Sequence, residues 1–149
     1  MSEYDTDLLL WSQRQADLLR RVGAGERLND QVDWENVAEE IECLGKSDRR
    51  EARNRIRVIL THLIKLVASP ATEPRPGWHQ TILEQRGMIE TLLDDSPSLR
   101  RAVPTIISQE LQAARTVALT ALADHNEQPR VDPAGLDFTV EQVLGPWLP

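Results

Sequence analysis

The sequence predicts an all-α protein, an up-and-down helical bundle of about five main helices with a short helical turn near the C-terminus. Apolar residues recur at the three- and four-residue spacing of helices through most of the 149 residues. Glycines and prolines divide these periodic stretches, and alternating runs of β-branched residues are absent. One hydrophobic core can form at this length, so we expect a single domain over 1–149, with its core in about 5–125 and a tail, 126–149, packed on it.

The first helix is expected to begin near Asp5 or Thr6 and to end at Val22. Asp5 and Asp7 suit a helix start, because the first backbone N–H groups are unpaired and the positive end of the helix dipole lies there. One face carries the apolar residues Leu8, Trp11, Leu18, Leu19 and Val22. Gly23 is the expected stop.

Two further helices are expected on either side of Gly45. The first begins near Asp33 and ends at Gly45, and its apolar stripe consists of Trp34, Val37, Ala38, Ile41 and Leu44. The second begins at Ser47 or Asp48 and ends before Pro70. Its wide stripe consists of Ile56, Ile59, Leu60, Leu63, Ile64, Leu66 and Val67.

Prolines organise the next part of the chain. The three prolines of residues 69–77 predict a loop, which a helix over 78–93 follows. A short helical turn is expected over 96–103, where a serine cap precedes a proline. Pro104 then either begins a separate long helix over 104–124 or kinks one continuous helix, and both alternatives stay open.

The last residues are expected to form a loop followed by one helical turn. Thr139 and Gln142 have the spacing of a capping box, and Gly145 closes the turn. Trp147 is expected to hold this tail on the body. The four tryptophans lie in separate segments, so each can anchor its own segment to a shared core.

Composition excludes several classes of protein. The net charge of −7 argues against broad binding to nucleic acid, and the single cysteine excludes a disulfide framework and a cysteine-rich zinc site. No apolar run approaches the roughly 18 residues that a membrane span requires. The N-terminus is acidic and polar, so we expect no signal peptide and a cytoplasmic protein without membrane contact.

The chain lacks recognisable catalytic and metal-binding motifs. No histidine follows a glutamate at the three-residue spacing of di-iron bundles, and no helix carries two histidines. There is no serine nucleophile elbow and no glycine-rich phosphate loop. We therefore expect no metal and no cofactor, and the sequence favours a protein that is not an enzyme.

Charge is concentrated in residues 33–57. The stretch 33–42 has five acids and no base, whereas 46–57 has six bases and two acids. Two solvated faces that attract each other are the simpler interpretation, because surface ion pairs are common and contribute only about 0–1 kcal/mol each. The alternative is a basic strip that meets a phosphate or an acidic partner. Its members are Arg49, Arg50, Arg53 and Arg57.

Five polar residues lie on the core side or at the borders of apolar stripes. They are Gln15, Glu40, His62, Gln85 and Arg86. Buried amide or imidazole groups must find hydrogen bonds or cost about 1–3 kcal/mol. The five could form a structural network that fixes helix register, or a small polar pocket in which His62 acts as acid or base and Glu40 orients it.

One known family shares an ordered set of motifs with this chain. The N-terminal motifs are Trp11 with Gln15 and Leu19, DWENVAEEIECLGKSDRRE over 33–51, and THLIK over 61–65. The later ones are Trp78, Thr81-Ile82, Glu84-Gln85-Arg86, Ser96-Pro97-Ser98-Leu99, Ala114-Arg115 and Glu141-Gln142-Val143-Leu144. In these motifs the chain resembles the bacterial family catalogued as domain of unknown function number 29. The resemblance implies an all-helical bundle and no established activity, and the family's motif residues include all five polar positions.

Taken together, these patterns favour a regulatory or neutralising, antitoxin-like protein that binds another macromolecule. We expect a protein partner or self-association, over more than roughly 1,000 Å² of buried area. Nucleic acid is a disfavoured partner. The alternative is an enzyme or small-ligand protein that uses the polar cluster around His62 and Glu40.

Overall fold

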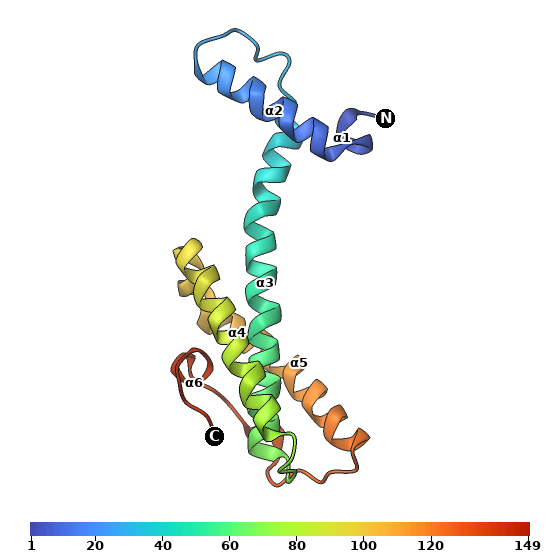
Figure 1. The fold of residues 1–149 in the computed structure, drawn as a ribbon, viewed down its shortest axis with the longest axis vertical. Helices are drawn as coiled ribbons and strands as arrows, with labels where there is room; N and C mark the ends of the chain where they lie inside the picture. The colour runs from blue at the N-terminus through green and yellow to red at the C-terminus, as the bar shows by residue number, and fades with distance from the viewer. The chain divides into compact units, whose positions relative to one another are not determined.

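The computed structural model describes all residues 1–149 and contains no strand, which confirms the all-α prediction (Figure 1). The α-helices are α1 (Glu3–Thr6), α2 (Leu8–Gly23), α3 (Trp34–Ala68), α4 (Arg75–Asp95), α5 (Val103–Asp124) and α6 (Val140–Leu144). Two short 3₁₀ helices are η1 (Pro97–Ala102) and η2 (Pro133–Gly135). The chain divides into two compact units, the N-terminal unit Met1–Ser47 and the C-terminal unit Asp48–Pro149. That residues 1–149 form a single domain stays a prediction.

The N-terminal unit is held by a small core between α2 and the start of α3. Trp11, Val32 and Val37 are its buried apolar residues. Asp7 caps α2 by accepting a hydrogen bond from the backbone N–H of Leu10 at 2.9 Å. The helix start expected near Asp5 therefore lies at Leu8, after the single turn of α1.

The helix stop expected at Gly45 is wrong. Residues 34–68 form one continuous α-helix, so the structure has four long helices where the sequence suggested five. A glycine inside a helix costs about 1 kcal/mol relative to alanine, which is too little to end a helix that strong helix formers continue on both sides. Glu42, Leu44 and Lys46 supply that propensity around Gly45.

The C-terminal unit contains the larger core. Fully buried side chains come from α3, α4 and α5, and α6 adds Val143. The buried residues of α3 include Ile56, Ile59, Leu60 and Leu63, which belong to the stripe expected for this segment. Burial of such side chains is worth about 1.5–3 kcal/mol each, so this core is the main source of stability of the unit.

Two prolines begin helices rather than interrupting them. Pro104 lies in the first turn of α5, where its missing N–H costs nothing, so the alternative of a separate long helix is the correct one. Helix α4 begins at Arg75 instead of Trp78 and includes Pro76 in its first turn. The loop expected over 69–77 is correspondingly shorter.

The tail folds as the capping pattern predicts. Thr139 accepts a hydrogen bond from the backbone N–H of Gln142, and the Gln142 side chain accepts one from the backbone N–H of Thr139. This capping box opens α6, and Gly145 follows its end. None of the helices combines the length with the apolar content that crossing a membrane requires.

Candidate functional site

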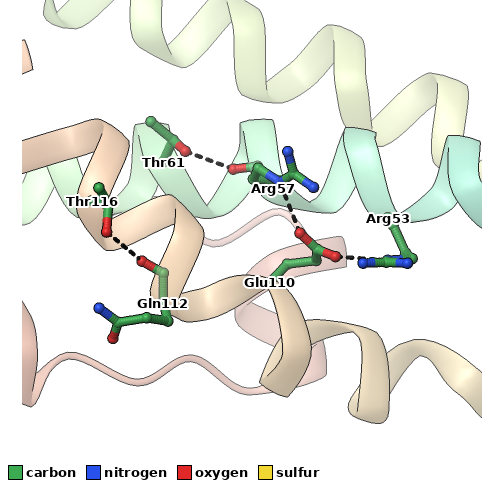
Figure 2. A network of polar contacts seen from close by, with 6 residues as sticks. All are labelled: Arg53, Arg57, Thr61, Glu110, Gln112 and Thr116. Atoms are coloured by element: carbon green, nitrogen blue, oxygen red, sulfur yellow. Dashed lines mark hydrogen bonds and ion pairs between the residues drawn. The ribbon is translucent and has the colours of Figure 1, made fainter.

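A buried carboxylate joins α3 and α5 in the C-terminal unit. Glu110 of α5 has a side chain only 2% exposed, and it accepts one hydrogen bond from Nε of Arg53 and one from Nε of Arg57, each at 2.7 Å (Figure 2). The two arginines lie four residues apart on α3, so both reach the same carboxylate. Their own side chains stay 46% and 40% exposed.

The pKa of Glu110 follows from competing effects of its surroundings. Burial raises the pKa, but the hydrogen bonds and charges of Arg53 and Arg57 outweigh burial and hold the pKa below its usual value. Glu110 is therefore ionised at neutral pH, and the three residues form a salt bridge that ties α3 to α5.

The predicted basic strip divides into two pairs. Arg53 and Arg57 bind Glu110, whereas Arg49 and Arg50 make no ion pair and no side-chain hydrogen bond within the chain. A role for the strip in binding a phosphate or an acidic partner stays a prediction, and Arg49 and Arg50 are its unpaired members.

Two members of the predicted polar cluster lie in the N-terminal unit, each with its own partner. Gln15 is buried, and its side-chain oxygen accepts a hydrogen bond from the backbone N–H of Asp33 at 2.8 Å. Glu40 accepts a hydrogen bond from the Tyr4 hydroxyl at 2.5 Å. This hydrogen bond, together with partial desolvation, raises the pKa of Tyr4 to about 12. Both residues stabilise the start of α3 against the N-terminal helices.

His62 and Gln85 lie in the C-terminal unit and are bound separately. His62 donates from Nδ1 to the carbonyl oxygen of Val58, one turn earlier in α3, at 2.8 Å. Burial lowers the pKa of His62, which favours the neutral imidazole. Gln85 accepts a hydrogen bond from Arg55 at 3.2 Å. No hydrogen bond joins any two of the five cluster residues, and a shared pocket of His62 and Glu40 stays a prediction.

Arg86 fastens the C-terminal segment onto α4. Its buried guanidinium donates to three backbone carbonyl oxygens, those of Val143 at 2.9 Å, Gln142 at 2.8 Å and Trp147 at 2.7 Å. Carbonyls at the end of a helix are left unpaired by the helix itself, and a cation satisfies them well. Arg86 is the cluster member with the most extensive contacts.

The N-terminal part of α3 exposes an apolar surface. Trp34 and Ile41, expected in the core, are 50% and 63% exposed, and Ala38 and Gly45 are exposed as well. Their spacings of three and four residues place them on one side of the helix. We call this surface, Trp34 with Ala38, Ile41 and Gly45, the α3 face. The sequence predicts that the apolar stripe of residues 34–44 lies in the core. In the structure only Val37 of that stripe is buried, where it packs on Trp11.

Glu110 and the α3 face are the features that sequence reasoning missed. Glu110 follows Ile106 and Ile107 by four and three residues and precedes Ala114 by four, so it lies on the apolar side of its helix. The presence of a polar residue on the apolar side of a helix identified Gln15 and Gln85, and the same criterion identifies Glu110. No group of three or more histidine, cysteine, aspartate or glutamate side chains is arranged to hold a metal ion.

The structure is that of an all-α protein with two compact helical units. The family described as Domain of unknown function DUF29 has a model that matches residues 3–148, nearly the whole chain, so the chain belongs to this family. Comparisons with curated proteins and with solved structures gave no match.

Proposed function

We propose that this protein functions by binding protein, through the α3 face, and that the occupant of this face is a second copy of the same chain. The exposure of Trp34 and Ile41 on one side of α3 is the observation that carries the proposal. Large apolar side chains grouped on one helix face are typical of helix pairing, in which each helix buries the stripe of the other.

The small core of the N-terminal unit supports the proposal. The unit comprises only Met1–Ser47 and buries three apolar residues, whereas seven large apolar side chains remain exposed. The exposed seven are Met1, Leu8, Leu9, Leu10, Trp34, Ile41 and Leu44. Units of this size bury a small fraction of their surface and often gain stability from association.

Gly45 supports a close crossing of two helices. It lies inside α3 on the exposed face, and open space surrounds the position where a Cβ would stand. In a solvent-exposed helix this glycine only lowers stability, by about 1 kcal/mol relative to alanine. At the crossing point of two helices Gly45 is favourable, because the missing side chain lets the partner helix approach closely.

The charges along α3 favour a second copy in antiparallel orientation. Glu42, before Gly45, and Lys46, after it, both belong to the N-terminal unit and have no ion-pair partner in the chain. When two copies cross antiparallel near Gly45, Glu42 of each helix lies beside Lys46 of the other. A parallel pair would place like charges together, which is unfavourable.

The regulatory, antitoxin-like role expected from the sequence rests on the same surface. A dimer that opens offers the α3 face to the helix of a target protein, which would compete with self-association. The unpaired Glu42 beside the face favours a target that carries basic residues around its own apolar stripe.

Replacing Ile41 by glutamate tests the proposal. The unchanged chain is expected to approach twice its 16.9 kDa as concentration rises, measured by light scattering on a sizing column. Ile41→Glu should weaken association by at least about a hundredfold, because the dimer interface would then bury two glutamate side chains, one from each copy.

Leu83→Glu is the matched control, since Leu83 is a comparably exposed apolar residue on α4, outside the α3 face. It should associate like the unchanged chain. A mass of one chain at every concentration for the unchanged protein, or equal loss of association in both variants, contradicts the proposal.

A further inference from the structure

A pocket of about 380 Å³ opens where α3 ends, α4 begins and α5 ends, all within the C-terminal unit. Its apolar wall includes Pro74, Trp78 and Leu122. Two charged side chains, Lys65 and Glu127, also line it. A concave apolar site with a few convergent polar groups is the usual form of a small-molecule site, and this volume lies in the range of such sites.

The Lys65 ammonium lies near the Trp78 ring but has no anionic or hydrogen-bonding partner. Its Nζ lies 5.7 Å from the centre of the Trp78 ring, and it makes no ion pair and no hydrogen bond within the chain. Partial burial lowers the pKa of Lys65, and the negative charge of Glu127 acts in the opposite direction. The lysine therefore bears a desolvation cost that an added carboxylate would offset.

Glu127 is held in place but keeps accepting capacity. One of its oxygens accepts a hydrogen bond from the hydroxyl of the fully buried Ser69. Glu127 makes no ion pair with any base of the chain, although its charge reaches Lys65. The pocket thus presents one cation and one anion that do not contact each other.

We propose that this pocket binds a small zwitterion with an apolar side chain, of the chemical class of free α-amino acids. The carboxylate of the ligand meets Lys65, its ammonium meets Glu127, and its side chain packs on Trp78 and Leu122. An α-amino acid carries its two charges a few ångströms apart, which suits two opposite charges that influence each other without forming an ion pair. This site is separate from the α3 face and does not depend on the proposed function.

Three related probes distinguish the contributions of the two charges. L-phenylalanine, its amide (which lacks the carboxylate) and its N-acetyl derivative (which lacks the ammonium) are titrated into the protein by calorimetry. L-phenylalanine is expected to bind at least tenfold more tightly than either blocked form. Lys65→Met should abolish the preference over the amide, and Glu127→Gln the preference over the N-acetyl derivative.

Arg101→Met is the matched control, because Arg101 is an exposed cation of the C-terminal unit that makes no ion pair and does not line the pocket. It should leave all three affinities unchanged. Equal binding of the three probes, or no heat from L-phenylalanine up to about 10 mM, overturns the proposal, since even weak sites saturate in that range. Helical circular dichroism of each variant establishes that it is folded.

Discussion

Arg86→Met is expected to lower the free energy of unfolding by about 3 kcal/mol. The substitution keeps most of the side-chain length but leaves the carbonyls of Gln142, Val143 and Trp147 without their donor. Each carbonyl left unpaired in a buried place costs about 1–3 kcal/mol, and partial exposure to water on release of the tail reduces the sum. Urea unfolding measures the loss, and hydrogen exchange should show faster exchange in residues 138–149.

Arg100→Met provides the comparison, because Arg100 is an exposed arginine whose two ion pairs are long, at 3.4 and 3.8 Å. Its substitution should change stability by no more than about 0.5 kcal/mol. An Arg86→Met protein as stable as Arg100→Met, with unchanged exchange in the tail, would show that the three carbonyl contacts do not hold the C-terminal segment.

Glu110→Gln is expected to cost about 2–3 kcal/mol at pH 7. The amide has nearly the size of the carboxylate, so the loss reflects the charge and the second acceptor oxygen. Breaking a fully buried ion pair costs about 3–5 kcal/mol, and the partial exposure of Arg53 and Arg57 lowers this figure because water solvates them once they are released.

The stability lost in Glu110→Gln is expected to decrease as the pH falls. The pKa of Glu110 is lower in the folded protein than its ordinary value of 4.5. Its stabilising contribution is therefore complete above that value and is lost as the pH falls through the lower, folded pKa. The unfolding free energies of the unchanged protein and of Glu110→Gln should converge as the pH falls from 5 toward that pKa. Glu90→Gln, at an exposed pair with Arg100, is the control and should show a small, flat difference.

The helices of this protein could be predicted from its sequence because their physical causes are local. Asp7 and Thr139 cap helices through hydrogen bonds within a few residues, and Pro104 fits the first turn of α5 through its fixed backbone angle. The core stripe around Ile59 was also correct, since its spacing matches the helical period. Gly45 was misread because a local stop signal is weak against helix propensity on both sides.

Burial and polar pairing could not be predicted as fully, because they depend on residues distant in the sequence. Trp34 and Ile41 have the spacing of core residues, yet their side chains stay 50% and 63% exposed. Glu110 meets Arg53 and Arg57 across more than fifty positions. The spacing identified Arg86 as a polar residue that must find hydrogen bonds, but not the carbonyls that accept them.

The most direct test of the proposed self-association is the dimer dissociation constant of Gly45→Leu, measured by sedimentation equilibrium beside Gly87→Leu. Both glycines are exposed positions inside helices with open space where a Cβ would stand, and leucine favours a helix over glycine by about 0.5–1 kcal/mol in each. We predict that Gly45→Leu weakens association by at least about tenfold despite its more stable helix, because the side chain keeps the crossing helices apart. Gly87→Leu should associate like the unchanged chain. A Gly45→Leu protein that associates as tightly as Gly87→Leu would contradict the account.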